Sequence, residues 1–365
     1  MASQGNAPMN PFRTPAMIRA IAAIAVVTAS TLFAGTTLAA TRLKPFVLAS
    51  APNAANLAAT VKAVEQSLSS HGFTVVGSEA PYTDARFGEH EQVSAVVIGV
   101  TSPALQAAAA QTPFGGYALV QRVSVTRIAG KAGTEIQVAY TNPKYMAAAY
   151  RLKSDLADVR AALGKALGAK EDFGSRHGLS VSDLRGYHYK IFMPYFTDMH
   201  TLARYKSHRE AMAAVEAGLA THAGGASKAW QVSVPGKPET LFGVALAGTP
   251  HNACSGDAYI MSRIDFAPVK STPHLPYDIL VSGRKVYALA VKFRIAINFP
   301  DLSMMGSHSF MSIMCAPDAI VKALKAVART QPTAAPAPAG TASAVPVVPA
   351  APASAAPAPA STHAG

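Results

Sequence analysis

The sequence lacks the short motifs that mark many common enzymes, and it contains few acidic side chains. The nucleophile motif Gly-x-Ser-x-Gly, the metalloprotease motif His-Glu-x-x-His and the phosphate-binding motif Gly-x-x-x-x-Gly-Lys are all absent. The 365 residues include 20 Asp and Glu against 32 Lys and Arg, so catalysis by paired carboxylates has few candidate residues. These absences argue against the standard hydrolases and favour a non-catalytic protein, with an unusual enzyme left open.

Long hydrophobic runs are also absent beyond the N-terminal segment. That segment carries two arginines, then an apolar stretch at residues 20–33, then small residues. This order predicts a secretory signal peptide, cleaved after Ala39 or Ala40. The alternative is an uncleaved membrane anchor. We therefore expect a periplasmic or secreted protein.

Cysteine is scarce, since Cys254 and Cys315 are the only two in the sequence. An even count in an oxidising compartment predicts one disulfide bond between them. Such a bond would close a loop of about 60 residues and add roughly 4 kcal/mol to the free energy of unfolding in the chain-entropy model.

Composition divides the chain into four segments. Residues 331–365 are almost all Ala, Pro, Ser, Thr and Val, without Asp, Glu, Lys or Arg. Such a segment cannot bury a core and is predicted to be a disordered spacer. The predicted segments are a signal peptide at 1–39, a first unit at 40–170, a second unit at 171–329 and a tail at 330–365.

Both units combine strands and helices. In the first unit, apolar residues at every third or fourth position of 57–68 predict a helix, and Ser102-Pro103 has the N-cap and first residue of another. Residues 81–92 are polar and predict a loop. A hairpin is expected at 120–140, where apolar residues alternate.

The second unit is expected to follow the same order. A strand is predicted at 190–193, a helix from Asp198 to Leu219, and a long hairpin strand at 285–297. The predicted fold class is therefore α+β, with two related units that each consist of an antiparallel sheet with helices packed on one face.

Two apolar stretches end in similar sequences. Val138-Ala-Tyr-Thr-Asn-Pro143 and Ile295-Ala-Ile-Asn-Phe-Pro300 both leave an expected strand through a proline. A helical run, an extended region and two apolar strands are predicted before each proline. The repetition, with a period of about 150 residues, indicates an internal duplication of one domain of ordinary size.

The repeated unit resembles a small bacterial α+β domain known as domain of unknown function number 302. Its members share a strand, a long helix that ends before Gly-Phe, and a Leu-Pro-led hairpin that closes at Tyr-x-x-Pro. The first unit has His71-Gly72-Phe73 and Tyr140-Thr-Asn-Pro143, and the second has Leu275-Pro276. The second unit lacks Gly-Phe and has Ile297 in place of the tyrosine. The resemblance implies the fold and the duplication, but no activity.

The protein is basic, with a formal net charge of +12. A basic exported protein meets anionic surfaces of the cell envelope. We expect an anionic envelope component or a small ligand as partner, with association at a membrane surface as a further prediction. A nucleic-acid partner is not expected, because export separates the protein from nucleic acid.

One group of cations is a candidate site for an anionic ligand. His200, Arg204 and His208 are spaced by four on the predicted helix, so they would share one face. Lys292 and Arg294 alternate on the predicted strand at 285–297 and could extend this surface. The alternative interpretation is an ordinary solvated surface.

A second candidate site is a segment rich in methionine. Met304, His308, Met311 and Cys315 follow one another at steps of four, three and four, which would place them on one face of a helix. Thioether, imidazole and thiolate groups are the soft ligands that select Cu(I). The alternative is core packing by the methionines, with Cys315 in a disulfide bond.

The sequence thus supports two functional hypotheses. The first is an exported, non-catalytic binding or accessory protein without a cofactor, whose two units form a groove for an anionic or amphipathic envelope ligand. The second is a periplasmic copper-handling protein that uses the methionine-rich segment. If the two copies have diverged in function, the residues after Pro300 are where we expect the difference.

Overall fold

The same order of strands and helices occurs twice along the chain. The computed structural model describes residues 41–50, 56–130 and 133–331, so the predicted signal peptide and nearly all of the predicted tail lie outside the described residues. The first repeat comprises β1 (Phe46–Leu48), α1 (Leu57–Ser70), β2 (Thr74–Phe87), β3 (Glu91–Thr101), α2 (Pro103–Gln111), β4 (Gln121–Gly130), β5 (Gly133–Thr141), α3 (Pro143–Ala149) and α4 (Ala157–Leu167).

The second repeat follows a linker, residues 168–199, that contains β6 (Glu171–Phe173) and α5 (Val181–Arg185). It comprises β7 (His200–Arg204), α6 (His208–Ala220), β8 (Ala226–Ser233), β9 (Glu239–Leu246), α7 (Asp257–Ile264), β10 (Tyr277–Ser282), β11 (Lys285–Ala288), α8 (Val291–Asn298) and α9 (Ala316–Ala328). Short 3₁₀ turns lie at Gly115–Ala118, Ala223–Gly225, Ala253–Ser255, Thr272–His274 and Phe310–Ile313. None of the described helices is long and apolar enough to cross a membrane.

The two sheets have the same strand order. The first sheet runs β2-β3-β4-β5-β1-β6, and the second runs β8-β9-β10-β11-β7 when read from its β8 edge. All neighbouring strands pair antiparallel. The fold is therefore α+β, as predicted, and the predicted repetition is present in its topology. β6 extends the first sheet beyond residue 170, where the sequence analysis placed the boundary between units.

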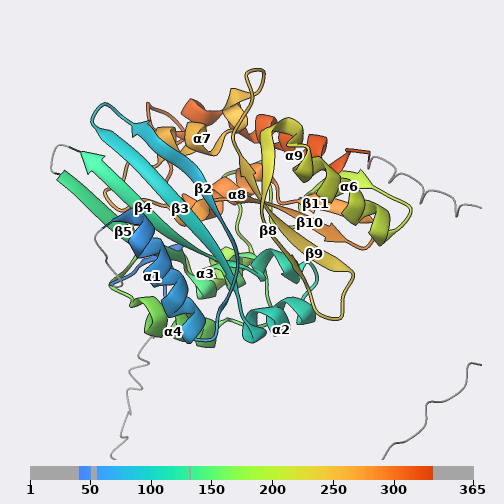
Figure 1. The fold of residues 1–365 in the computed structure, drawn as a ribbon, viewed down its shortest axis with the longest axis horizontal. Helices are drawn as coiled ribbons and strands as arrows, with labels where there is room; N and C mark the ends of the chain where they lie inside the picture. Colours follow the sequence, from blue (N-terminus) through green and yellow to red (C-terminus); the bar gives the residue numbers. More distant parts are fainter. Residues whose placement is uncertain (1–40, 51–55, 131–132, 332–365) are drawn as a thin grey trace, which may run out of the picture. The chain divides into compact units, whose positions relative to one another are not determined.

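In each repeat, the first and last helices pack together on the sheet. α1 contacts α4 and the strands β2, β3 and β4, and α6 contacts α9, β8 and β10 (Figure 1). The apolar periodicity explains the first case, since Val64 and Leu68 of α1 are fully buried. The Asn56 side chain caps α1 by accepting a hydrogen bond from the backbone N–H of Ala59 at 2.9 Å. Local sequence signals thus determine where this helix begins and which face it buries.

Several predicted elements of the second repeat are wrong. Residues 190–193 form a turn and not a strand, and the helix expected from Asp198 is instead strand β7 followed by α6. Ser207 is the N-cap of α6, since its side chain accepts from the N–H of Glu210. In the first repeat, the predicted loop at 81–92 is mostly strand, because β2 continues to Phe87 and β3 begins at Glu91.

The prediction of a long strand at 285–297 is also wrong, and the correction changes which residues of the two repeats correspond to each other. β11 ends at Ala288, and Val291–Asn298 form helix α8, of which all residues except Lys292 are buried. A short helix that is apolar on every side has no periodicity that distinguishes it from a buried strand. Pro143 begins α3 and Val291 begins the equivalent helix α8, so Pro300 is not the counterpart of Pro143.

The two sheets meet at equivalent edges. β2 is the edge strand of the first sheet, β8 is the edge strand of the second, and the two lie against each other (Figure 1). At Gly77 of β2, a Cβ atom would lie 2.2 Å from the carbonyl oxygen of Ala229 in β8, so only glycine permits this approach of the two backbones. Described core residues of both repeats form one continuous apolar cluster.

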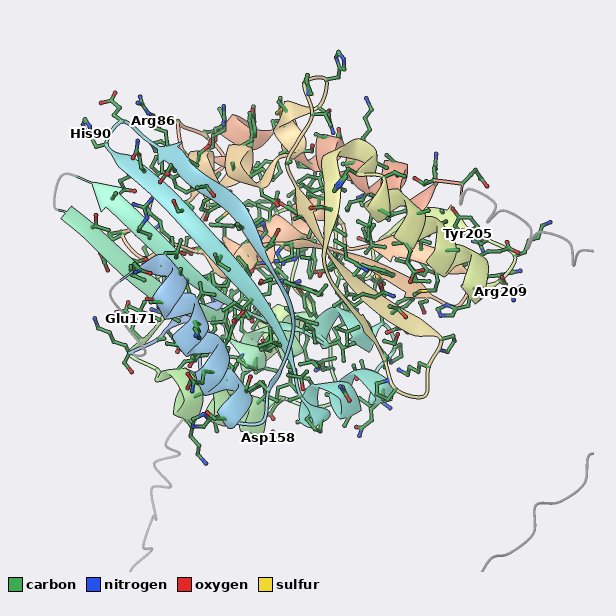
Figure 2. All side chains as sticks on the ribbon, viewed as in Figure 1. Arg86, His90, Asp158, Glu171, Tyr205 and Arg209 are labelled. Carbon is green, nitrogen blue, oxygen red and sulfur yellow. A yellow bond between two sulfur atoms is a disulfide. The ribbon has the colours of Figure 1, made fainter. Side chains whose placement is uncertain are left out.

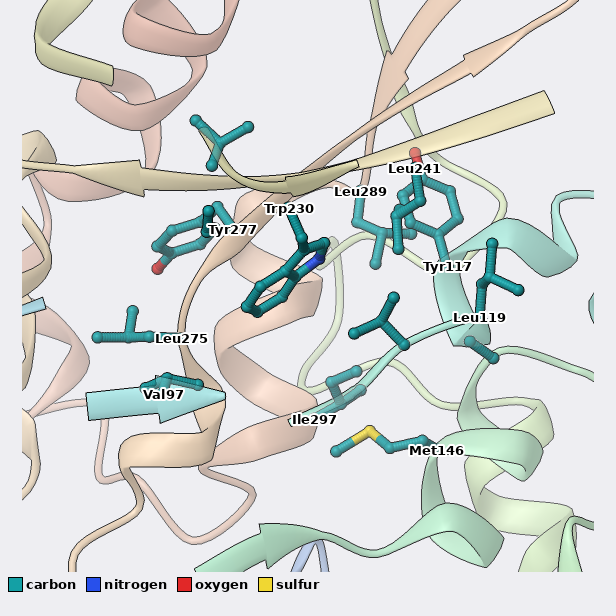
Figure 3. Packing of buried hydrophobic residues seen from close by; sticks show 14 of the residues in the cluster. Val97, Tyr117, Leu119, Met146, Trp230, Leu241, Leu275, Tyr277, Leu289 and Ile297 are labelled. Carbon is teal, nitrogen blue, oxygen red and sulfur yellow. The ribbon is translucent and has the colours of Figure 1, made fainter. Parts of the chain in front are cut away.

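Trp230 is the single tryptophan and joins the two sheets. Its side chain extends from β8 among Leu241, Tyr117 and Tyr277 (Figure 3). A Cβ atom at Gly99 of β3 would lie 2.6 Å from Trp230 Cε3, and one at Gly243 of β9 would lie 2.3 Å from Trp230 Cε2. One glycine from each sheet therefore makes room for the indole ring.

We expect the Gly99→Ala substitution to destabilise the protein by about 1–3 kcal/mol, because the added methyl group must displace the buried indole of Trp230. The matched control is Gly164→Ala in helix α4, where the nearest atom to an added Cβ is Arg160 Nη1 at 3.7 Å. That substitution is expected to stabilise the helix by about 0.5–1 kcal/mol. Urea denaturation followed by Trp230 fluorescence measures both, and equal effects of the two substitutions would contradict the packing described here.

Candidate functional site

Two adjoining surface cavities lie between the linker and the segment that follows α8. The basic cavity has a volume of about 700 Å³ and the apolar cavity about 630 Å³. Both are lined by Ser175 and Arg176 of the linker and by residues 301–303. We call the two together the linker groove. The residues after Pro300, which the sequence analysis singled out, thus line both of its cavities.

Hydrogen bonds hold the two walls of the linker groove together. Asp301 accepts a hydrogen bond from the backbone N–H of Arg176 at 2.5 Å and one from the Ser175 hydroxyl at 3.4 Å. The Tyr189 hydroxyl donates to the carbonyl oxygen of Leu302. The relative position of the linker and the segment after Pro300 is therefore fixed at three points on these walls.

The basic cavity carries an excess of positive charge. Arg42, Arg176 and Lys190 line it, with Asp301 as its carboxylate. The Arg42 guanidinium is positioned by hydrogen bonds that it donates to the carbonyl oxygens of His177 at 2.9 Å and Gly178 at 3.1 Å. The Arg176 side chain is 82% exposed, and its Nε lies 4.0 Å from Asp301. This cavity is therefore suited to an anionic group.

The apolar cavity has a different chemistry. Six apolar side chains contribute to its lining, namely Phe173, Ile264, Phe266, Ala267, Phe299 and Leu302. Lys44 also lines it, and its ammonium group forms no hydrogen bond or ion pair with the described residues. Glu171, Asp265 and Asp301 line this cavity as well. Because the two cavities adjoin, aromatic and aliphatic surface in the linker groove lies next to the cations of the basic cavity.

The cations that the sequence predicted as an anion site on one helix belong to two elements. His200 and Arg204 lie on edge strand β7 and not on a helix. His208 begins α6 and its Nδ1 donates to the carbonyl oxygen of Gly283 at 2.9 Å. Burial and the charge of Lys325 lower the pKa of His200, which opposes the protonation expected to strengthen this site. The shared helix face was a wrong prediction, because these residues belong to two elements.

Lys292 and Arg294 are also separated from each other. Both lie on helix α8, where Lys292 is exposed and Arg294 is buried. Arg294 donates to the carbonyl oxygen of His274 at 2.5 Å and to His274 Nδ1 at 3.2 Å. The expected sheet face that would carry both cations does not exist.

The methionine-rich segment does not form the helix face expected of a copper site. Of residues 304–315, only Phe310–Ile313 are helical, as a 3₁₀ turn. Met304 and Met311 are linked through their backbones by a 3.2 Å hydrogen bond, while the ring of His308 stacks on Phe266 with centroids 3.5 Å apart. Cu(I) binding by Met304, His308 and Met311 stays a prediction without its helical geometry.

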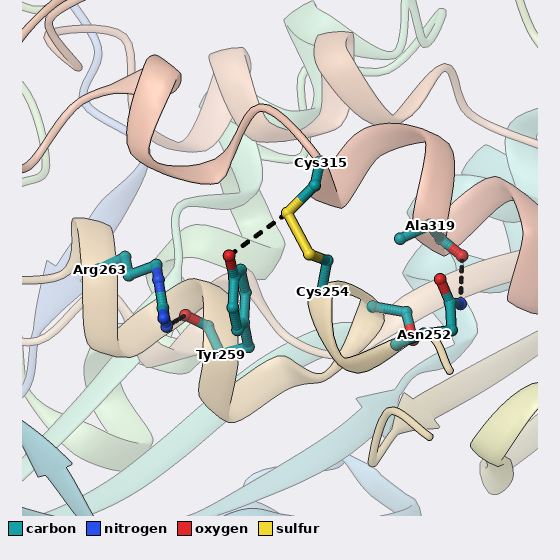
Figure 4. Close-up of a disulfide and its surroundings, with 7 residues drawn as sticks. Asn252, Cys254, Tyr259, Arg263, Cys315 and Ala319 are labelled. Carbon is teal, nitrogen blue, oxygen red and sulfur yellow. Dashed lines mark hydrogen bonds between the residues drawn. A yellow bond between two sulfur atoms is a disulfide. The ribbon is translucent and has the colours of Figure 1, made fainter. Parts of the chain in front are cut away.

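Cys315 is not available as a thiolate ligand, because it is bonded to Cys254 as predicted. The Cα atoms of the two cysteines lie 6.0 Å apart, within the usual range for a disulfide. The bond joins the turn before α7 to the start of α9, and the Tyr259 hydroxyl lies 3.3 Å from Cys315 Sγ (Figure 4). The Asn252 side chain adds a second link by donating to the carbonyl oxygen of Ala319 at 2.9 Å.

Charged side chains also meet in the interior, between the two sheets. Arg122 Nη2 on β4 lies 2.5 Å from Asp278 Oδ2 on β10, the equivalent strand of the second repeat. Arg294 Nε lies 3.9 Å from the same oxygen, and all three side chains are 2% exposed. By contrast, charged residues such as Arg86 and Asp158 project outward from the ribbon (Figure 2).

Two further carboxyl groups complete what we call the buried ion cluster, which comprises Glu79, Arg122, Asp257, Asp278 and Arg294. Burial raises the pKa of Glu79 well above its usual value, and the charge of Asp257 raises it further. Burial raises the pKa of Asp257 to about 8, against the hydrogen bond that its Oδ2 accepts from the N–H of Leu246. The cluster therefore retains protons that an unfolded chain would release.

His274 beside the cluster is neutral. Burial and the charge of Arg294 lower the pKa of His274 well below its usual value. Since Arg294 donates to Nδ1, the ring proton resides on Nε2 and is donated to the Tyr277 hydroxyl at 3.2 Å. This arrangement is not predicted from the sequence, although single charged residues in the apolar strands around Arg122 and Asp278 are a signal for it.

Comparison with known proteins supports the expected domain. Residues 50–169 match the model of a family described as "Domain of unknown function DUF302". The match coincides with the first repeat and confirms the resemblance seen in its motifs. No curated protein and no solved structure matches the chain.

Stability is expected to fall as the pH rises from about 4 to about 8. In this range the unfolded chain releases the proton of Asp257, whose ordinary pKa is 3.8, while the native state with its pKa of about 8 retains it. Asp257→Asn cannot ionise and still accepts from Leu246, so it should be more stable than the parent at pH 8 by at least about 1.4 kcal/mol, the equivalent of one pKa unit. Urea denaturation across this pH range measures the difference.

The control for the Asp257 experiment is Asp158→Asn, an exposed residue on α4. Its unfolding curves should shift with pH in parallel with those of the parent. If Asp257→Asn also follows the parent in parallel, the buried carboxyl group of Asp257 does not retain its proton in the native state.

Titration of thiols tests the state of the cysteines. The denatured protein should show no reactive thiol before reduction and two after it, because Cys254 and Cys315 are bonded to each other. Loss of the bond in a Cys254→Ser/Cys315→Ser variant should destabilise the protein by about 2–4 kcal/mol. Free thiols in the unreduced protein would restore Cys315 to the predicted copper ligands.

Proposed function

We propose that this protein, whose first repeat matches a family without an assigned activity, is an exported, non-catalytic binding protein for an anionic amphipathic molecule of the cell envelope. The observation that carries the proposal is the linker groove, in which a cavity lined by three cations adjoins one lined by aromatic and aliphatic side chains. The cavities have volumes of about 700 and about 630 Å³, each within the range of ligand-binding pockets.

The two cavities suggest how such a ligand would bind. The anionic group would lie in the basic cavity, near Arg42, Arg176 and Lys190, where charge-assisted hydrogen bonds are available. The apolar part of the ligand would extend past Leu302, which lines both cavities, toward Phe266. Its contact with these side chains would remove apolar surface of the ligand and of the protein from water. A ligand with only one of these two parts would use half of the groove.

Several features support a binding function over catalysis. The common catalytic motifs are absent from the sequence. Of the buried carboxyl groups whose pKa values are raised, Glu79 and Asp257 line neither cavity of the linker groove. Asp265, whose pKa burial raises to about 7, lines the apolar cavity, where its carboxyl group accepts hydrogen bonds from the backbone N–H of Ser271. The signal-peptide pattern and the formal net charge of +12 favour an envelope location with anionic ligands.

Calorimetry with dodecanoate as a probe tests the proposal. Dodecanoate should bind more tightly than hexanoate by a factor greater than about ten, because each buried methylene contributes about 0.8 kcal/mol. Dodecanol, which lacks the charge, should bind more weakly than dodecanoate. Equal affinity for dodecanoate, hexanoate and dodecanol would refute an amphipathic anion as the ligand.

Substitutions assign the binding to the linker groove. Arg176→Gln should weaken dodecanoate binding about tenfold, because a charge-assisted hydrogen bond contributes about 1.5–3 kcal/mol. Phe266→Ser should weaken dodecanoate binding but leave hexanoate binding nearly unchanged. The matched control is Arg209→Gln, an exposed cation on α6 that lines neither cavity. If Arg209→Gln and Arg176→Gln weaken dodecanoate binding equally, the affinity depends on the overall positive charge of the surface, and the linker groove is not the binding site.

A further inference from the structure

The linker contains a turn that presents two large apolar side chains to solvent. Ile191 is 78% exposed and Phe192 is fully exposed, which makes them the two most exposed large apolar residues in the described part of the chain. They are the central residues of a turn in which the N–H of Met193 donates to the carbonyl oxygen of Lys190 at 3.0 Å. Together they form what we call the apolar tip.

The backbone at the apolar tip has a conformation that is unfavourable for phenylalanine. Phe192 has a φ of +66°, the left-handed region that normally requires glycine or asparagine at this position of a turn. A bulky residue there is disfavoured, and Phe192 gains no burial within the protein to offset the strain. Such outliers cluster at functional sites, which makes this turn a candidate for one.

The loop that carries the apolar tip has an ordered base. The rings of His188 and Tyr195 lie on either side of the tip with centroids 4.7 Å apart. After the tip, the chain is anchored by Phe196, which is buried against Tyr117 and Tyr150. The protein therefore presents Ile191 and Phe192 from a structured base.

Cations and aromatic hydroxyl groups surround this base. Lys190 adjoins the tip directly, and its ammonium group lies 5.6 Å from the centre of the Tyr189 ring. Tyr189 and Lys190 also line the basic cavity, together with Arg42 and Arg176. The loop thus combines an apolar tip, aromatic rings behind it and positive charge at its base.

We propose that the loop at residues 188–195 docks on an anionic lipid bilayer, with Ile191 and Phe192 inserted at the membrane surface. Apolar side chains would enter the boundary between headgroups and acyl chains, and tyrosines favour the level of the headgroups. Lys190, Arg42 and Arg176 provide the charge complementarity to anionic headgroups. The inserted residues Ile191 and Phe192 line neither cavity of the linker groove, whereas Lys190, Arg42 and Arg176 also line its basic cavity. Variants of Ile191 and Phe192 therefore distinguish the docking from the ligand proposed for the groove.

Vesicle sedimentation of the full-length chain tests the docking. Vesicles of phosphatidylcholine with a minor share of phosphatidylglycerol should bind the parent more tightly than vesicles of phosphatidylcholine alone. The double variant Ile191→Ser/Phe192→Ser should bind the anionic vesicles at least about tenfold more weakly, since two apolar side chains no longer leave water. Because all variants share the apolar stretch at residues 20–33, any affinity from that stretch is the same in each.

A conservative variant separates insertion from general surface effects. Phe192→Trp should retain binding, and its fluorescence should shift to shorter wavelength on anionic vesicles, while Trp230 is already buried and should not respond. Lys190→Gln should weaken binding and reduce its salt dependence. Unchanged vesicle binding by the Ile191→Ser/Phe192→Ser variant, or no spectral shift of Phe192→Trp, would overturn the proposal. Dodecanoate binding by the same serine variant reports separately on the linker groove.

Discussion

The buried ion pair between Arg122 and Asp278 is the interaction on which the arrangement of the two repeats depends. Arg122 comes from β4 and Asp278 from β10, so the pair connects equivalent strands of the two sheets. Charges that are 2% exposed must be paired, because the cost of an unpaired charge in the interior is several kcal/mol. Arg122 pairs with Gly99 of β3, and Asp278 pairs with Gly243 of β9. Both glycines lie against the ring of Trp230. The ion pair and the indole ring together determine how the sheets meet.

The position of the linker groove follows from this arrangement. In the first repeat, a short connection at residues 150–156 joins its last two helices, whereas in the second the connection is longer and spans residues 299–315. The longer connection contributes Asp301 and Leu302 to both cavities and is held near the linker by the contacts of Asp301 and Tyr189. The two repeats thus share a topology, while the segments that form the candidate site belong to only one of them or to the linker.

The sequence predicted the first repeat more accurately than the second, for identifiable reasons. Helix α1 has clear caps and an apolar face, so its period and its ends were visible. Helix α8 is apolar nearly all round and was therefore taken for a strand, which put Arg294 on an exposed sheet face when it is buried beside Asp278. His200 and Arg204 were placed on a helix because their spacing of four suits one, whereas they are the two ends of strand β7, whose pairing with β11 has a register shift between them.

The sequence by itself determined features that depend on short-range residue patterns or on residue counts. It established helix α1 and the β4–β5 hairpin of the first repeat, the presence of a repetition, and the pairing of Cys254 with Cys315, since only two cysteines exist to pair. The tertiary structure alone decided which charges are buried together and which residues line the linker groove. Residues 42–44, 171–190, 264–271 and 299–308 are far apart in the sequence. The chemistry of each side chain depends on partners supplied by the other segments, and no local pattern encodes those partners.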